Sequence, residues 1–577
     1  MSLTSIQTMA TSALLTAQYQ MAVASANIAD ASTTGATQKT YTPTSSVSLT
    51  SALTTGEVTR ITDAYLSKTV NVSAGANAAS STVNTYLQSY DSALGSLSNS
   101  DDVSSLLTSF QDALSTLAGS PSSSSDQSAV VSDASGLATS ISSLSSTIQS
   151  LRTQASSDIG ATVGAINTDL QTLQTLNQQI AAADNAGSDA TSLEDQRDST
   201  LTDLSSMIGV DYYTNADNQL VVYDQGGDQL LGGQAATLSY ASTGALSAST
   251  SYPGSISGIM VNGTDITGSI TSGTLGGLIQ LRDDILPGQQ DQLNQLASGL
   301  IDAANAATNT GTAYPAPNSL TSAASVSASD SFSATGVARI AVTSSTGAVV
   351  STSDLDLSSY STVSDLLAGL NGISGISASI SSSGQLVIQA TDSSDGVAIN
   401  GMTSSVGASD QSFSSYFGFN DLFTGDDAST IAVSSALTAD SADLPTGTLS
   451  DSASLAVGST GISAGDTSAL TALADALDTS ISLPATGSAA AQTASLADAA
   501  TSFVSNAASV ISSASTTATT NDSVYTAAQS ALSNATGVSV DQQTALLTQY
   551  QNQYEAIAQL MSAAKSLYST LITMMES

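Results

Sequence analysis

The sequence predicts a mainly α-helical protein into which β domains are inserted. Near both ends, and along most of residues 77–207, apolar residues recur in steps of three and four. Between residues 210–267 and again between 318–437, this helical period gives way to short alternating runs bounded by Gly, Asn and Ser. We therefore expect paired N- and C-terminal coiled-coil helices, a central helical bundle domain and an outer β-rich domain.

The C-terminal stretch carries the clearest helical pattern. Its apolar residues follow one another in steps of three and four over four heptads, the period at which a helix keeps one stripe facing a partner. The members of this seam are Leu547, Tyr550, Tyr554, Ile557, Met561, Ala564, Tyr568, Leu571 and Met575. A helix cannot bury such a seam alone, so the pattern predicts a partner helix.

The N-terminal stretch offers that partner. A seam with the same spacing and smaller side chains comprises Leu3, Ala10, Leu14, Ala17, Met21, Ala24 and Ile28. Small residues facing large ones suit interdigitating helices, so we expect the two ends to pack together as an assembly seam. Periodicity alone is equally compatible with two ordinary amphipathic surface helices.

The changes of pattern divide the chain into seven segments. The ends are an N-terminal helix with its linker (1–72) and a C-terminal coiled-coil helix (537–577). Between them we expect a helical domain in two parts (73–209 and 439–536), a β-hairpin or sheet segment (210–270), a helical segment (271–316) and an inserted β-rich outer domain (317–438).

Composition excludes several classes of function. The chain has 47 acidic and eight basic residues and a net charge of −39, and its basic residues are scattered, which excludes nucleic-acid binding and disfavours an anionic membrane surface. It has neither Cys nor His, which removes thiol catalysis, Cys/His metal sites and Ser–His–Asp chemistry. No stretch matches a signal peptide or a membrane span.

The charged motifs offer no catalytic site. Adjacent acids such as Asp283 and Asp284 point about 100° apart on a helix and do not converge on one substrate atom. Arg197 and Arg282 each lie in an acidic helical cluster, where either a buried ion pair or a solvated side chain is possible. We expect no enzyme activity, no cofactor and no metal.

Several motifs together resemble the flagellar hook-associated protein 1 (FlgK) family. Leu193–Asp198 is similar to the family's Leu-Asp-Gln-Arg-Asp segment and contains Asp195, Gln196, Arg197 and Asp198. Gly273–Leu278, which contains Gly276 and Gly277, resembles the family's next block together with Arg282 and Asp283. Ser25–Ala29, which contains Asn27, resembles an element of flagellar axial proteins, and residues 58–66 resemble the family's Val-x-Arg-x-x-Asp-x-Phe/Tyr-Leu.

Three further segments resemble the family with differences. Asn305–Gly311 resembles Asn-x-x-His-x-x-Gly, with Thr308 in place of His. Phe417–Phe423 is similar to a segment of the β insert in some bacterial members. At Gly537–Gln543 the family's two acids are replaced by Gln542 and Gln543. The matches fall in family order along the chain.

This resemblance implies a structural junction between flagellar hook and filament. Its implied partners are further copies of the chain in a ring, the hook protein, a second junction protein and an export chaperone on the C-terminal helix. The chain would be exported unfolded through the flagellar channel, without a cleaved signal peptide. The alternatives are another axial protein (a second junction protein or a flagellin-like one), a secreted acidic adhesin or surface-layer protein, and an enzyme such as a polysaccharide lyase.

Overall fold

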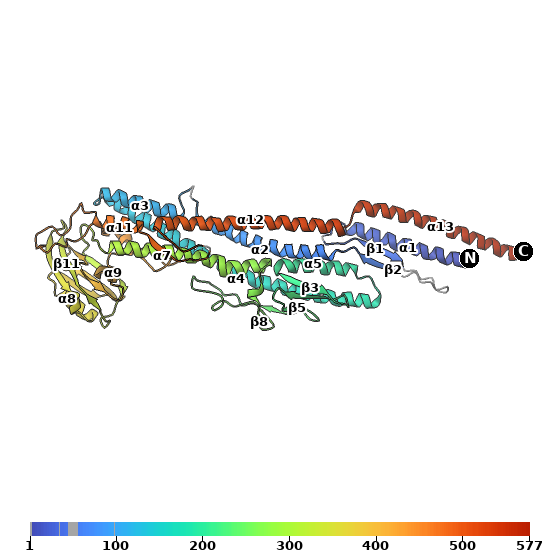
Figure 1. The fold of residues 1–577 in the computed structure, drawn as a ribbon, viewed down its shortest axis with the longest axis horizontal. Helices are drawn as coiled ribbons and strands as arrows, with labels where there is room; N and C mark the ends of the chain where they lie inside the picture. Colours follow the sequence, from blue (N-terminus) through green and yellow to red (C-terminus); the bar gives the residue numbers. More distant parts are fainter. Residues whose placement is uncertain (1–2, 34, 44–55, 97–98, 488, 577) are drawn as a thin grey trace.

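The protein is an elongated rod with both chain ends at one tip and a β-rich domain at the other (Figure 1). The computed structural model describes residues 3–33, 35–43, 56–96, 99–487 and 489–576. Helix α1 (Leu3–Asp30) and helix α13 (Val540–Glu576) form the tip that carries the termini. The predicted fold class, mainly α with inserted β domains, is confirmed.

A shaft of helices forms the middle of the rod. Its members are α2 (Ala64–Leu94), α3 (Val103–Gly119), the 63-residue α4 (Ser124–Ala186), α5 (Thr191–Met207), α6 (Gly273–Gln280), α7 (Leu286–Thr308), α11 (Ser468–Asp478) and α12 (Leu496–Thr536). The side chains of Asp63, Asp102 and Ser123 accept hydrogen bonds from the first free N–H groups of α2, α3 and α4, as N-caps do. One continuous apolar core joins these helices.

Short β elements lie along one side of the shaft. Strands β3 (Val210–Thr214), β4 (Leu220–Asp224) and β5 (Gln229–Leu231) form an antiparallel sheet, and β6 (Leu238–Ser239), β7 (Met260–Val261) and β8 (Thr264–Asp265) form another. Asn177 of α4 holds Leu220 through both backbone polar groups, at 2.8 and 2.9 Å, and Asn167 holds Leu238 in the same way. These side-chain amides satisfy backbone groups at the start of β4 and of β6.

The β-rich domain has its own apolar core at the far tip. One sheet has the strand order β12 (Val349–Asp356), β11 (Val337–Ser344), β15 (Asp395–Asn400), and a second has β13 (Ile376–Ile380), β14 (Gln385–Ala390), β9 (Ser319–Ser325). The pair β10 (Ala334–Thr335) and β16 (Ser405–Val406), with helices α8 (Val363–Asn371) and α9 (Phe413–Phe417), completes it. Its buried core runs from Leu320 to Phe419.

The structure corrects the predicted end of the inserted domain at residue 438. Strands β17 (Phe423–Thr424) and β18 (Ala432–Val433) and helix α10 (Ser435–Ala439) bury Leu422, Phe423, Ile431 and Leu437 in the core of the shaft instead. Residues 422–437 therefore belong to the shaft. Their Gly- and Asp-rich composition is similar to that of the β-rich domain. The sequence pattern does not show which of two cores a short apolar run joins.

Two other predicted boundaries are also corrected. The boundary at 72/73 falls inside α2, because the helix already begins at Ala64, immediately after the Asp63 cap. The predicted helical return of 439–536 contains long irregular segments and a hairpin of β19 (Ile481–Leu483) and β20 (Gln492–Ala494) before α12 begins at Leu496. Within the described residues, no helix is long and apolar enough to cross a membrane.

Candidate functional site: the terminal helix pair and its polar junction

Helices α1 and α13 pack side by side and run in opposite directions; we call them the terminal helix pair (Figure 1). The hydroxyl of Thr11 lies 3.7 Å from the sulfur of Met561, and the amide of Gln18 lies 3.5 Å from the hydroxyl of Tyr554. Farther along α1, the Asn27 amide donates to the side-chain oxygen of Gln543 at 3.0 Å. Partner numbers fall on α13 as they rise on α1, which defines the antiparallel register.

The predicted seams differ in burial along the pair. On α1, Ala10, Ala17 and Ala24 are buried, while Leu14, Met21 and Ile28 are half-buried; the side chain of Leu3 lies outside the described residues. On α13, Ala564 is buried, and the half-buried members are Leu547, Tyr550, Tyr554, Ile557 and Met561. The structure therefore brings these parts of the two seams together.

The last part of the C-terminal seam has no partner within the described chain. Tyr568, Leu571 and Met575 are 54%, 51% and 87% exposed. The antiparallel register carries Leu571 and Met575 past the start of α1, so no facing helix covers them. Leu560 and Leu567, which flank the seam, are exposed as well. The tip of α13 thus exposes several large apolar side chains to solvent.

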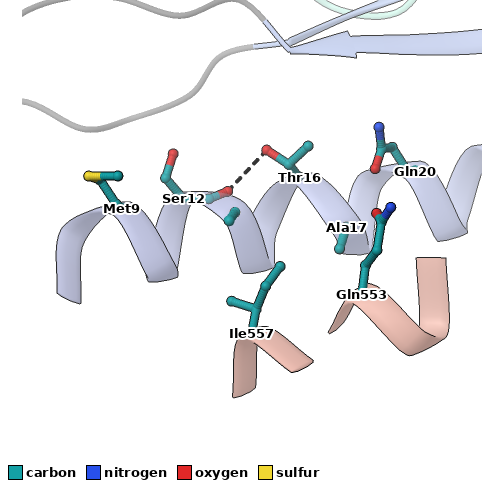
Figure 2. A pocket seen from close by; sticks show the side chains of 8 residues that line it. Met9, Ser12, Thr16, Ala17, Gln20, Gln553 and Ile557 are labelled. Carbon is teal, nitrogen blue, oxygen red and sulfur yellow. Dashed lines mark hydrogen bonds between the residues drawn. The ribbon is translucent and has the colours of Figure 1, made fainter. Parts of the chain in front are cut away.

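A cavity of about 500 Å³ opens on the terminal helix pair. Figure 2 shows Gln553 and Ile557 of α13 pointing toward α1, while Met9, Ser12 and Thr16 extend from α1. Ala13, Ala17 and Gln20 complete the lining. The small side chains of α1 leave this space, since Ala and Ser cannot fill the gap beside a partner helix. The pair therefore has incomplete packing on one face and exposed apolar side chains on another.

A cluster of ion pairs, here called the polar junction, connects the terminal helix pair to the shaft. Strands β1 (Lys39–Pro43) and β2 (Gly56–Arg60) place Lys39 directly opposite Arg60. Arg60 contacts Glu194, Asp195 and Asp198 of α5 at 2.8, 2.9 and 2.8 Å. Lys39 lies 3.4 Å from Asp195 and donates to the Ser192 hydroxyl at 2.9 Å, and the Thr37 hydroxyl donates to Asp195 at 2.6 Å.

The electrostatics of the polar junction favour a charged Arg60. Burial alone would lower the pKa of Arg60, but Asp198, Asp195 and Glu194 together raise it above its usual value. Only 9% of the Arg60 side chain is exposed, so the carboxylates act with little solvent screening. The motif of residues 58–66 therefore contains two structural residues, namely Arg60 in the junction and Asp63 as the cap of α2.

Asn27 joins three segments at the base of the helix pair. It is 1% exposed, donates to the carbonyl of Lys39 at 2.8 Å and accepts from the Lys39 N–H at 3.0 Å. Its amide also donates to Gln543, whose own buried Nε2 has no hydrogen-bond partner. Nearby, the Gln38 N–H donates to the carbonyl of Thr536 at the end of α12. Gln543, which stands where the family pattern has an acid, therefore still accepts a hydrogen bond through its Oε1. Its Nε2 donor is left unpaired.

The remaining motif residues of α5 have different environments. Arg197 is buried and donates to the carbonyl of Asn218 at 2.7 Å, and its nearest carboxylate oxygen, on Asp198, is 3.8 Å from its Nε. Burial lowers its pKa, although Asp198 and Glu194 partly counter this effect. Gln196 is exposed. Arg197 is therefore not solvated: it is buried, binds a backbone carbonyl, and has only a long ion pair with Asp198.

Arg282, from the second family motif, lies inside the π-helical turn Leu281–Ile285. Its side chain is fully buried, and its guanidinium binds both carboxylate oxygens of Asp283 at 2.7 and 2.5 Å. It lies over the rings of Tyr240 and Tyr252, at 5.6 and 5.7 Å from their centroids, and donates to the Tyr240 hydroxyl. Burial alone would lower the pKa of Arg282, but Asp283 together with Tyr240 raises it above its usual value. This centre fixes the loop of residues 240–252 on the shaft.

The two motif glycines allow close approach of the backbone, to another helix at Gly277 and to the turn before α6 at Gly276. A Cβ at Gly277 would lie 2.5 Å from the carbonyl oxygen of Ala79, where α6 crosses α2. A Cβ at Gly276 would lie 2.7 Å from the Thr271 backbone. The motif residues therefore support a scaffold. Among the described residues, no group of three or more acidic side chains is arranged to hold a metal ion.

One family of known proteins matches the helical part of this scaffold. Residues 87–317, about two fifths of the chain, match the family model "Flagellar hook-associated protein FlgK helical domain". A solved structure, the flagellar hook junction protein FlgK from Burkholderia pseudomallei, is 17% identical; the alignment covers 80% of this chain and 98% of that one, with a TM-score of 0.47. No curated protein sequence matches the chain.

The predicted resemblance to FlgK is confirmed for the helical domain, residues 87–317. The family supports a structural role in the flagellar axis. The sequence placed Arg60 in the motif of residues 58–66 but assigned neither it nor Lys39 to a site. A signal was available, because these are two of only eight basic residues in the chain.

Proposed function

We propose that this chain, which contains a FlgK-type helical domain, assembles through its terminal helix pair into the flagellar axis and joins hook to filament there. The observation that supports the proposal best is the apolar surface at the tip of α13. Leu560, Leu567, Tyr568, Leu571 and Met575 are each at least half exposed. In an isolated chain these side chains face water. Stable monomers rarely expose large contiguous apolar patches in this way.

Burial of this surface would supply the driving force for assembly. Each Leu buried between subunits contributes roughly 1.5–3 kcal/mol. The cavity between α1 and α13 offers further space for side chains of a neighbouring copy. Because the exposed tip and the cavity are different surfaces, a contact between them would be heterologous and could close a ring or continue a helix. This function requires no catalytic residue.

The proposed partners follow from the same arrangement. Further copies of the chain would form the ring, with the hook protein on one side and a second junction protein on the other. An export chaperone would cover the apolar tip of α13 before assembly. Export through the flagellar channel, without a cleaved signal peptide, suits a chain without Cys, because unfolding and refolding then involve no disulfides.

The experiment replaces two exposed leucines, Leu567 and Leu571, with Ser. Because both side chains are exposed, the isolated chain should keep its melting temperature, while assembly into flagella should be lost. Motility and electron microscopy of flagella, in cells whose own copy is deleted, measure assembly. The matched control is Ser569→Ala, an exposed change on the same turn. Normal flagella built from the Leu567→Ser, Leu571→Ser protein would refute the proposal.

A further inference from the structure

Two motifs that the proposed function does not use meet at the joint between shaft and β-rich domain. The first is Asn305–Gly311, at the end of α7, and the second is Phe417–Phe423, at the end of the inserted domain. Although more than a hundred residues separate them in sequence, hydrogen bonds connect them directly. We call this contact the interdomain joint.

Asn305 binds the second motif through both ends of its amide. Its oxygen accepts from the N–H groups of Leu422 and Phe423, at 3.0 and 2.9 Å. Its nitrogen donates to the carbonyl of Phe423 at 2.8 Å. Three backbone polar groups of one turn thus depend on a single side chain.

Asn309 binds the neighbouring residues from one helical turn later. It is 2% exposed, and its nitrogen donates to the carboxylate of Asp421 at 2.6 Å. Its oxygen accepts from the Ser414 hydroxyl at 2.9 Å and from the Asn420 N–H at 3.0 Å. Asn420 returns a hydrogen bond to the carbonyl of Gly311 at 3.0 Å. The two asparagines therefore hold the whole segment 414–423.

The held segment contributes to both cores. Phe417 and Phe419 are buried in the core of the β-rich domain. Leu422 and Phe423, only three and four residues after Phe419, are buried in the core of the shaft, where Phe423 packs edge-on against Phe110 at 6.2 Å. A shift of this segment would disturb both cores at once.

Thr308, where the family pattern has His, lies between the two asparagines. It is 1% exposed, and its hydroxyl donates to the carbonyl of Ala304, one turn back in its own helix. Among the described hydrogen bonds of this segment, those of the Thr308 hydroxyl stay within α7. Asn305 and Gly311 bond across the joint, and a Cβ at Gly311 would lie 2.5 Å from that of Ala469.

We propose that Asn305 and Asn309 are positioning residues that fix the β-rich domain in one orientation on the shaft. Replacing Asn305 with an apolar residue leaves three backbone polar groups without this partner. Replacing Asn309 removes the partner of one backbone N–H, one hydroxyl and one carboxylate. With both asparagines in place, the β-rich domain continues the rod rigidly and does not move about a flexible linker. This inference is independent of assembly and applies to the isolated chain.

The test measures the distance between the domains. Because the chain has no Cys, Cys can be introduced at the exposed positions Ser115, on α3, and Ser379, on β13, and spin-labelled specifically. Pulsed electron spin resonance on the full chain should give a single narrow distance distribution. In Asn305→Ala, Asn309→Ala this peak should be lost to a broad distribution, while circular dichroism still reports both folded domains.

Asn371→Ala is the matched control. Asn371 makes the same bidentate contact, with Ala378 at 2.9 Å for both bonds, but it lies wholly inside the β-rich domain. It should destabilise that domain and leave the interdomain distance narrow. An unchanged narrow peak in the folded double variant would overturn the proposal. If the double variant fails to fold, the wild-type measurement still decides, because a broad wild-type distribution would overturn it as well.

Discussion

Replacing Arg60 with Met tests whether the polar junction holds the terminal helix pair on the shaft. The substitution keeps much of the side-chain length and removes the charge that faces Glu194, Asp195 and Asp198. Lys39 remains, but it contacts only one of these three carboxylates, Asp195. The Arg60→Met variant would thus have a carboxylate cluster with much weaker compensation.

The expected cost follows from burial. Arg60 is 9% exposed, and Glu194 and Asp195 are 18% and 11% exposed, so the pairs are largely shielded from solvent. Removing one partner of a buried ion pair costs about 3–5 kcal/mol. Asp198 is 46% exposed, and its pair with Arg60 adds less because solvent screens it. We expect the lower part of this range, about 3 kcal/mol.

Hydrogen exchange resolves where the loss occurs. Amides that close β1 on β2, such as those of Thr40 and Thr59, should exchange faster in Arg60→Met, up to the limit at which this region opens locally. Amides in the core of α4 should keep their protection, because the junction lies outside that core.

Lys68→Met is the matched control for this prediction. The Lys68–Asp211 pair, at 3.4 Å with both side chains more than half exposed, should contribute about 0–1 kcal/mol. If Arg60→Met changes exchange in β1 and β2 no more than Lys68→Met does, the junction does not hold the terminal pair and the reasoning is wrong.

Two further substitutions test the packing of the shaft and the interdomain joint. Gly277→Ala should lower the free energy of unfolding in urea by about 1–3 kcal/mol, because its Cβ would meet the Ala79 carbonyl. Gly164→Ala, at an exposed position of α4 with open space around it, should raise that free energy by about 1 kcal/mol. Equal effects of the two substitutions would contradict this reasoning. Burial raises the pKa of Asp421 in the folded protein, and the hydrogen bond from the Asn309 amide partly counters this rise. The ionised carboxylate therefore destabilises the folded state above the folded-state pKa. Below the unfolded-state pKa this destabilisation is absent. Asp421→Asn should therefore raise the melting temperature at pH 7, and this gain should shrink toward pH 3; a gain that grows on acidification would show the opposite linkage.

The sequence by itself carried the local part of this structure. Spacing in threes and fours located the helices, and it identified the faces of α1 and α13 that carry the buried Ala10, Ala17 and Ala564. The Asn215–Asn218 turn marked the β3–β4 hairpin, where Asn218 adopts a positive φ of 56°. These features depend on neighbours a few residues away, so a linear pattern contains them. The ordered motifs also pointed to the FlgK family, whose helical-domain model matches residues 87–317.

Tertiary structure decided which elements each residue meets. Periodicity shows that one face of a helix is buried but not what buries it, and it did not show that the end of the C-terminal seam extends past its partner. Arg60 and Asp195 are 135 residues apart, and Asn305 and Phe423 are 118 apart, so neither contact has a local signature. The end of the inserted domain was misplaced for the same reason. A short apolar run such as Leu422–Phe423 can join either core, and only the fold brings one of them within reach.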